Sequence, residues 1–406
     1  MRPPLVSAGL ALAALACAGG HRAVPATAPT PAADSATARR PAAAAPAQPR
    51  AAAAESDSAR RAAPPAAALA HGWMSLASTG VDRFLRAHPT YDGRGVLVGI
   101  LDTGIDPGVP GLTTTSTGGP KVLDLRDFSG EGAVPLARLV PRGDTVEVGG
   151  RRLGGFGRVV ALSTGGPYYG GTIAEIPLGE PPAADLNGNG AVRDTLAVVV
   201  VRAPDGWVLL ADTDGDGSLA GERAIHDYLA GREHFGWGPK GSEPRVNVAA
   251  NFGEQNGAPT LDLVFDTGGH GTHVSGIAAG HDLYGVAGFD GVAPGAQLLG
   301  LKIANSAQGG ISTTGSMLRA MDYAIRFAQA RNLPLVLNMS FGVGNEIEGQ
   351  ARIDGIVDSV LAQHADVVFA ISAGNDGPGL STIGFPGSAS RALSVGATLP
   401  GSFLPP

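Results

Sequence analysis

The sequence is poor in cysteine, lysine and aromatic side chains. Its 406 residues contain a single cysteine, so no disulfide can form within the chain and a disulfide-stapled fold is excluded. Only three of its 29 cationic residues are lysines and the formal net charge is −7, whereas nucleic-acid-binding proteins gather positive charge on one face. We therefore expect no nucleic-acid partner. With 44% apolar residues, the chain can nevertheless fill a substantial core.

No aromatic residue precedes Trp73, and the start of this stretch has the pattern of an export signal. Residues 1–20 combine Arg2 with an apolar run over 5–16, which fits a signal peptide and is too short for a membrane span of ~20 residues. Cys17 directly follows that run, as the lipidated cysteine does in bacterial lipoproteins. The alternative is an inert cysteine in a removed peptide. We expect a secreted or cell-envelope bacterial protein, with Cys17 as a candidate lipid anchor to the membrane.

The segment that follows, 21–70, is dominated by alanine and proline. The first 70 residues contain 29 alanines and 10 prolines. Such a composition cannot bury enough apolar area to offset the entropy of ordering, so we predict a disordered tether.

Beyond residue 70, continuous apolar runs alternate with segments of helical periodicity. This alternation predicts an α/β fold with a doubly wound parallel sheet. In such sheets catalytic groups gather at the carboxyl ends of the strands. The predicted strands are 96–101, 298–303, 335–339, 367–371 and 393–397, and the predicted helices are 274–280, 317–327 and 353–361.

Between the first and second of these strands the sequence pattern changes to glycine-rich turns and strands of alternating pattern, such as 195–202 and 206–210. We predict a β-rich insertion over 111–260. It would divide the α/β domain into a first part, 71–110, and a second part, 261–406.

Three polar residues have the context of catalytic groups. His270 lies between glycines at the start of a predicted helix, where a ring is open to substrate and suits a general base. Asp102 ends a buried strand and could orient that base. Taken singly, each has a plainer reading: Asp102 as a turn residue, His270 with His273 as a metal pair, and Asn375 as part of an ordinary loop.

In their order along the chain, the segments 100–104 (Ile-Leu-Asp-Thr-Gly), 269–276 (Gly-His-Gly-Thr-His-Val-Ser-Gly) and 372–375 (Ser-Ala-Gly-Asn) resemble the subtilisin-like serine peptidases. The resemblance implies a subtilisin-like fold, polypeptide substrates and no cofactor for the chemistry. It assigns Asp102 as the charge-stabilising acid, His270 as the general base and Asn375 as the oxyanion donor. It also implies a substrate-binding segment and pocket wall made of Ser340, Phe341, Gly342, Ser372, Ala373 and Gly374.

Within that family, 102–112, 291–297 and the long insertion are most similar to the tripeptidyl-peptidase II branch. That branch holds the free amine of its substrate with acidic residues, one of them directly after the Ser-aromatic-Gly segment. Here this position is Val343, with Glu346 and Glu348 slightly further on. We therefore expect an endopeptidase, with a tripeptidyl aminopeptidase as the alternative.

The family's nucleophile motif, Gly-Thr-Ser-Met-Ala-x-Pro, does not occur in the sequence. The triplet Gly315-Ser316-Met317 precedes Asn375, whereas the family's serine follows the asparagine, so we interpret it as a helix start. We expect the catalytic serine to lie beyond residue 406 and the 406-residue chain alone to be inactive. A pseudopeptidase that only binds is the alternative.

The insertion also contains a candidate calcium loop. Asp212, Asp214 and Asp216 alternate before a glycine, as at the start of an EF-hand loop, with Glu222 as a candidate fourth ligand. A similar run, Asp-Leu-Asn-Gly-Asn-Gly, covers 185–190. We predict structural calcium here. The alternative is a pair of hairpin turns, and a calcium-dependent adhesion module is a further hypothesis for the insertion.

Overall fold

The computed structural model describes residues 74, 76–175, 185–239, 241, 246–308, 310–344 and 348–398. The predicted signal peptide, Cys17, the tether over 21–70 and Glu346 lie outside these residues. Within them, no helix combines the length and the apolar character needed to span a membrane.

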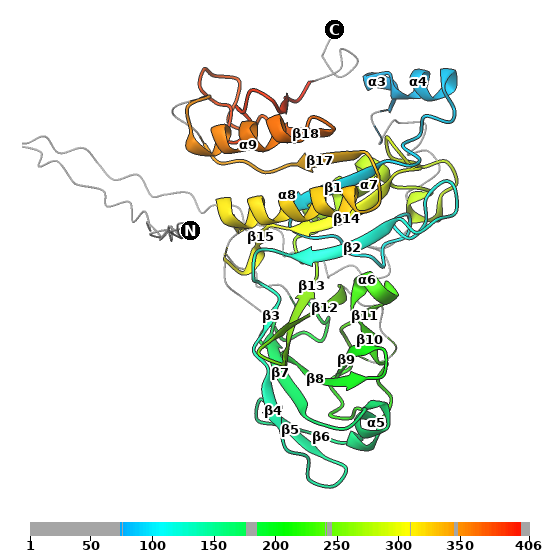
Figure 1. The fold of residues 1–406 in the computed structure, drawn as a ribbon. Coiled ribbons are helices and arrows are strands. Elements are labelled where there is room, and N and C mark those ends of the chain that lie inside the picture. Colours follow the sequence, from blue (N-terminus) through cyan, green and yellow to red (C-terminus); the bar gives the residue numbers. More distant parts are fainter. Residues whose placement is uncertain are drawn as a thin grey trace, which may run out of the picture. The chain divides into compact units, whose positions relative to one another are not determined.

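A six-stranded sheet, in which every pair of neighbours is parallel, forms the centre of the α/β part (Figure 1). The predicted continuous apolar strands are all present in it. In spatial order it comprises β19 (Leu393–Val395), β18 (Val367–Ser372), β17 (Leu335–Met339), β1 (Leu97–Asp102), β14 (Gln297–Lys302) and β2 (Val122–Asp127).

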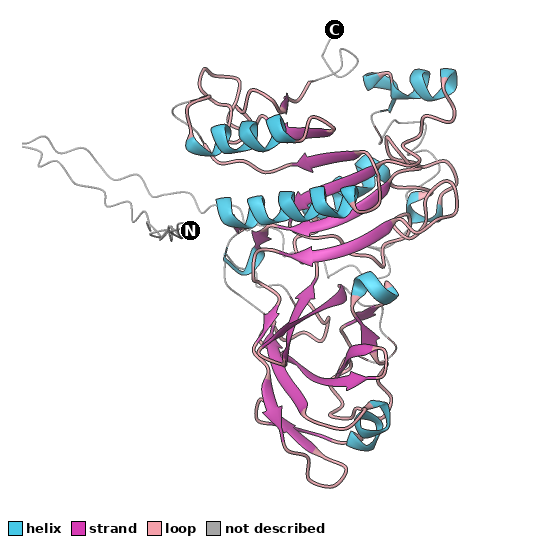
Figure 2. Ribbon diagram, viewed as in Figure 1, coloured by secondary structure: helices cyan, strands magenta, loops and turns pink. Residues whose placement is uncertain are grey.

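Helices cover both faces of this sheet, which confirms the predicted doubly wound α/β fold (Figure 2). On β1, Leu97 and Leu101 face α8 (Thr314–Gln329) and α9 (Arg352–Gln363), whereas Val98 and Ile100 face α7 (His270–Ala279). Successive strand side chains point to opposite faces, so a strand buried on both faces is apolar throughout. That is the pattern of β1, all six of whose residues are buried.

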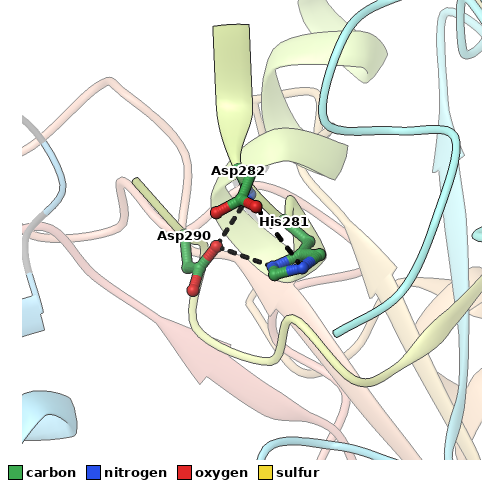
Figure 3. Close-up of side chains that lie close together, drawn as sticks. All are labelled: His281, Asp282 and Asp290. Atoms are coloured by element: carbon green, nitrogen blue, oxygen red, sulfur yellow. Dashed lines mark hydrogen bonds and ion pairs between the residues drawn. The ribbon is translucent and has the colours of Figure 1, made fainter. Parts of the chain in front are cut away.

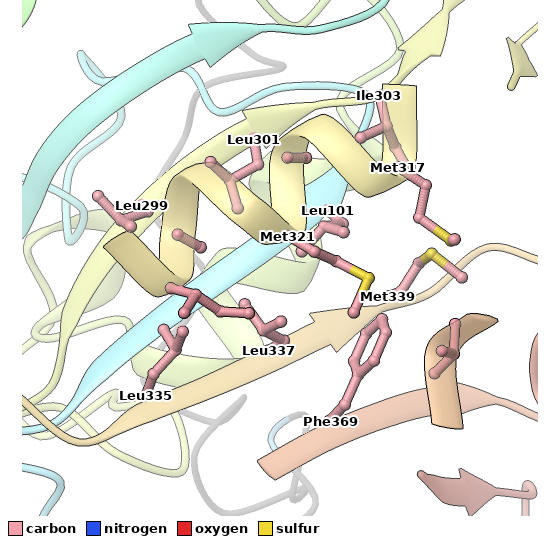
Figure 4. Close-up of a cluster of buried hydrophobic side chains, with 14 of the residues drawn as sticks. Leu101, Leu299, Leu301, Ile303, Met317, Met321, Leu335, Leu337, Met339 and Phe369 are labelled. Carbon is pink, nitrogen blue, oxygen red and sulfur yellow. The ribbon is translucent and has the colours of Figure 1, made fainter. Parts of the chain in front are cut away.

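Helix α8 packs on one face of the sheet. Its apolar stripe packs Met317 and Met321 against strand leucines and Phe369 (Figure 4). A capping box between Thr313 and Ser316 begins the helix, since each side chain bonds the other's backbone N–H. Ser316 is therefore a buried residue of the helix start, as interpreted from the sequence.

Strand β2 corrects the predicted start of the insertion. We placed residues from 111 onward in the insertion, but β2 is an edge strand of the parallel sheet, paired with β14. Its sequence, Val-Leu-Asp-Leu-Arg-Asp, mixes apolar and charged residues and therefore lacks the signature of a central strand. By sheet membership the insertion begins after Asp127, and it ends with β13 (Ala258–Val264) instead of at 260.

The insertion consists of two antiparallel sheets whose buried faces share one apolar cluster. One has the order β10-β9-β8-β7-β4 and the other β11-β12-β13-β3. The remaining bounds are β3 (Ala133–Val134), β4 (Ala137–Leu139), β7 (Tyr168–Ala174), β8 (Thr195–Ala203), β9 (Gly206–Ala211), β10 (Ile225–His226), β11 (His234–Gly236) and β12 (Asn247–Gln255).

Smaller elements complete the described chain. They are α3 (Leu76–Thr79), α4 (Val81–Ala87), α5 (Phe156–Leu162), α6 (Tyr228–Gly231), the hairpins β5 (Val146–Val148) with β6 (Arg151–Leu153) and β15 (Ala304–Asn305) with β16 (Ile311–Ser312), and the 3-10 turns Leu283–Gly285 and Ser306–Gln308.

The start of α7 packs directly against the end of β1, and a glycine makes this possible. A Cβ atom on Gly271 would lie 2.1 Å from the carbonyl oxygen of Gly104 and 3.0 Å from Cβ of Asp102. The backbone N–H of Gly271 donates to the Thr103 hydroxyl at 2.9 Å. Any side chain at 271 would therefore force helix and strand apart.

We expect Gly271→Ala to lower the free energy of unfolding by about 1–3 kcal/mol, because the added methyl meets rigid backbone. Urea denaturation monitored by circular dichroism measures this. The matched control is Gly268→Ala, because a Cβ there meets no atom within 4 Å. Equal stability of the two variants would contradict the packing described.

Candidate active site

Asp102 and His270, 168 residues apart, meet at the junction of β1 and α7. His270 Nδ1 lies 2.6 Å from Asp102 Oδ1. Asp102 is only 3% exposed, whereas 53% of the His270 side chain is open to solvent. A buried carboxylate on Nδ1 fixes the orientation of the ring and leaves Nε2 free to exchange a proton with a substrate or nucleophile. This is the geometry of an oriented general base.

The carboxylate of Asp102 is held from one side. Its Oδ1 also accepts the backbone N–H of Thr103 at 2.8 Å. Its Oδ2 is buried and has no hydrogen-bond partner among the described residues. Both hydrogen bonds of the acid therefore converge on the oxygen that faces the histidine.

Asp266 organises the start of α7 and was not singled out from the sequence. Its Oδ1 accepts the Thr103 hydroxyl at 2.8 Å and the N–H of Gly269 at 3.0 Å. Its Oδ2 accepts both the N–H and the hydroxyl of Thr272, at 2.9 and 2.5 Å. An acid just before a helix start is a recognisable N-terminal signal, because it satisfies the unpaired N–H groups there.

The predicted substrate-binding residues lie at the same edge of the sheet. Ser340, Phe341 and Gly342 follow β17, while Ser372 ends its neighbour β18 and leads to Ala373, Gly374 and Asn375. Carboxyl ends of neighbouring parallel strands form one edge, where open α/β sheets bind ligands. Asn375 is exposed, and Gly374 has a φ of 94°, the left-handed turn that carries the chain off β18.

A third segment, 383–385, hydrogen-bonds to the segment after β17 and to the segment after β18. Val343 and Phe385 form a two-way backbone bridge, with N···O distances of 3.3 and 3.0 Å. Gly384 donates its N–H to the carbonyl of Ala373 at 3.3 Å. Glu348, a candidate amine-binding acid, accepts the N–H of Ile383 at 3.0 Å, so one of its oxygens is committed to this segment.

The candidate calcium ligands are brought together in part. Ligand oxygens of Asp212, Asp214 and Asp216 lie within 4.8 Å of one another. Glu222 does not join them, because its carboxylate accepts the N–H and hydroxyl of Thr213 at 2.8–2.9 Å. Glu222 as a fourth ligand stays a prediction. Burial raises the pKa of both Asp212 and Glu222.

The second candidate calcium loop, 185–190, contributes residues to the same cavity as the first. Asn187 and Asn189 line the same space of about 360 Å³ as Asp212 and Asp214. Both asparagines donate their side-chain amides to Asp194, at 3.0 and 2.5 Å. Arg151 also lines the cavity and pairs with Asp212 at 2.7 Å, so a cation bound there would compete with the guanidinium.

Another cluster of metal-ligating residue types, His281, Asp282 and Asp290, closes the loop between α7 and β14 (Figure 3). His281 Nδ1 lies 3.0 Å from Asp290 Oδ1, which also accepts the N–H of Asp282 at 2.8 Å. Asp282 in turn accepts the N–H of Gly288 at 2.8 Å. These side chains serve as loop closures. In the described part of the chain, His270 and His273 belong to no group of three metal-ligating side chains.

The chain is similar to known peptidases over most of its length. Tripeptidyl-peptidase 2 of Oryza sativa subsp. japonica is 28% identical over 391 residues, covering 78% of this chain and 27% of that protein. Pyrolysin of Pyrococcus furiosus is 28% identical over 362 residues, covering 76% and 25%. The chain thus spans about a quarter of the length of these relatives.

Among solved structures, the crystal structure of tripeptidyl peptidase 2 superposes with a TM-score of 0.64 at 24% identity, over 81% of this chain and 30% of that one. This likeness shows a shared fold. Residues 93–402 match the model of the subtilase family, peptidase S8. The match covers most of the chain, and the chain belongs to the subtilase family of subtilisin-like peptidases, with tripeptidyl-peptidase II among its relatives.

Proposed function

We propose that the chain carries the aspartate and histidine of a serine endopeptidase triad, with the serine supplied by sequence beyond residue 406. The observation that carries the proposal is the 2.6 Å contact between buried Asp102 and solvent-exposed His270. The chain spans only about a quarter of the length of its relatives, so the activity of the complete protein is also proposed here.

In this mechanism His270 Nε2 removes the proton of the serine hydroxyl as its oxygen attacks the substrate carbonyl carbon. Asp102 stabilises the imidazolium that forms, and the side-chain amide of Asn375 donates to the developing oxyanion. His270 then gives the proton to the leaving amine, and water later hydrolyses the acyl-enzyme by the same route. The backbone at Ser340 to Gly342 would pair with the extended substrate.

The helices leave one face of the sheet exposed at its β18–β19 edge, which supports a further segment of peptidase domain there. Val368, Leu393 and Val395 on the neighbouring strands β18 and β19 are 46%, 58% and 55% exposed. Parallel sheets are normally covered on both faces. A segment bearing the serine would supply such cover.

Internal cleavage is favoured over release of tripeptides by the residue after the substrate-binding segment. The resemblance to the tripeptidyl-peptidase II branch implies a carboxylate there that binds the free amine, but the position holds Val343, which is 45% exposed. Glu348 has one oxygen on the Ile383 N–H. The similarity to tripeptidyl-peptidase 2 favours the tripeptidyl alternative, so the assay must separate internal cleavage from the release of tripeptides.

The test uses the gene product extended past codon 406 and an internally quenched peptide with a blocked amino terminus. We expect His270→Ala to lower kcat by about 10⁴-fold or more, the size of loss known for triad histidines of subtilisin-type enzymes. The matched control is His273→Ala, which removes an exposed histidine of the same helix and should leave turnover unchanged.

Cleavage only of peptides with a free amino terminus, three residues at a time, would replace the endopeptidase with the tripeptidyl alternative. Equal turnover by His270→Ala and the unmodified enzyme would contradict the triad. An extended frame that supplies no serine in a Gly-Thr-Ser context would favour the non-catalytic binding protein.

We also propose that the loop around Asp212, Asp214 and Asp216 binds calcium. Three carboxylates that converge within 4.8 Å beside a shared polar cavity support this. Oxygen ligands of this kind suit Ca²⁺, which takes 6–8 of them, so backbone carbonyls and water would complete the site.

Isothermal titration calorimetry with CaCl₂ should give a Kd on the order of 10⁻⁴–10⁻³ M, and Asp214→Asn should weaken it about tenfold. Asp205→Asn is the control, an exposed acid of the same insertion outside the loop. Protons compete with calcium for Asp212, whose pKa is raised above 3.8 by burial. Affinity should therefore fall as the pH decreases, starting above the pH at which exposed aspartates titrate. Absence of heat at any pH would contradict the site.

A further inference from the structure

Two of the three lysines of the chain, Lys121 and Lys302, are completely buried. A buried ammonium is strongly unfavourable unless it is paired and hydrogen-bonded, so its partners show what it does. Lys302 is the last residue of β14 and lies directly beside Asp102 in the strand register. Its position next to the catalytic acid distinguishes it from Lys121.

Three segments converge on the Lys302 ammonium. Its Nζ lies 2.9 Å from Glu131 Oε2, in a pair whose side chains are 0% and 3% exposed. It donates to the carbonyl of Thr103 at 2.5 Å and lies 5.4 Å from the centre of the Phe265 ring. Glu131 precedes the first strand of the insertion, Thr103 follows Asp102, and Phe265 precedes Asp266.

Thr103 is the residue through which this contact reaches the active site. Its N–H donates to the Asp102 carboxylate, and its hydroxyl donates to Asp266 and accepts the N–H of Gly271 at the start of α7. Its carbonyl is the group that Lys302 holds. All polar groups of Thr103 are thereby fixed, and with them the peptide that orients Asp102 towards His270.

Glu131 ties this arrangement to the insertion. One of its oxygens accepts both the Lys302 ammonium and the N–H of Ser306, at 2.9 Å each. Glu131 itself leads directly into β3, which pairs with β13 in the four-stranded sheet. The carboxylate therefore connects the first strand of the insertion to the end of β14.

We propose that Lys302 is a positioning residue for the Asp102–His270 pair, holding the Thr103 carbonyl, and that Glu131 keeps the lysine in place from the insertion side. The proposal rests on the proposed function, since it takes this pair to be the catalytic one. Lys121 is the contrast: its ammonium donates to the carbonyls of Pro294 and Ala296, in the chain that enters β14 from the opposite end.

The test observes the Nδ1 proton of His270 by NMR in the ¹⁵N-labelled 406-residue chain, assigned by its loss in His270→Gln. The rate at which this proton exchanges with water is measured by saturation transfer. We expect Lys302→Met to accelerate exchange about tenfold, because an unanchored Thr103 lets the Asp102–His270 hydrogen bond open more often. Lys121→Met should exchange at the rate of the unmodified chain.

The double variant Lys302→Met/Glu131→Gln separates positioning from stability. It leaves no unpaired buried charge, so it should unfold at a higher temperature than Lys302→Met alone, which thermal unfolding measures. The Thr103 carbonyl still lacks its donor, so exchange should remain about tenfold faster. Exchange at the unmodified rate in this folded variant, or equal acceleration in Lys121→Met, would overturn the proposal.

This measurement does not depend on a serine or on turnover. Failure of the endopeptidase assay together with the expected exchange rates would remove the proposed function and leave Lys302 as the residue that fixes the pair. Normal, His270-dependent proteolysis with unchanged exchange rates would support the proposed function and overturn the positioning role of Lys302.

Discussion

The close approach of α7 to β1 is the constraint on which the rest of the site depends. A 2.6 Å contact between Asp102 and His270 requires the two backbones to touch, and they do so where Gly271 lies against Gly104. The same junction buries the acid while it leaves the imidazole in solvent. A histidine that must both be held and exchange protons needs this asymmetry, because a fully buried ring could not reach a substrate.

Partly buried polar contacts join the insertion to the α/β part, which distinguishes it from an appended module. Asp106, four residues after Asp102, accepts the side-chain amide of Asn247 at 2.8 Å, and burial raises the pKa of this aspartate. Arg126 of β2 pairs with Asp227 at 3.2 Å. Losing the Asn247 amide is costly, because the buried Asp106 carboxylate would keep fewer hydrogen-bond partners. The insertion and the carboxyl end of β1 are thus expected to order together.

Elements whose evidence is local could be predicted from the sequence, and those that depend on distant contacts could not. Strand β1 is apolar throughout, and the glycines around His270 mark a helix start open to substrate, so the sheet and the pair of candidate residues were foreseeable. Strand β2 was assigned to the insertion because an edge strand carries charges. Asp266 and Lys302 act through Thr103, 163 and 199 residues away, and nothing in their own neighbourhoods signals this.

The scarcity of lysine acquires a structural meaning from these contacts. On the surface, lysine and arginine can replace each other as cations. Arginine supplies 26 of the 29 cations here, the difference between 29 and three lysines. A cavity closed by carbonyl and carboxylate oxygens instead favours the compact ammonium over a planar guanidinium. Lysine can also shed its charge when buried, and burial lowers the pKa of Lys121 to about 8. Both buried lysines donate to backbone carbonyls at the ends of β14: Lys121 to Pro294 and Ala296, where the chain enters the strand, and Lys302, its last residue, to Thr103. These two lysines are thus placed at the two ends of β14, the neighbour of the strand that carries Asp102.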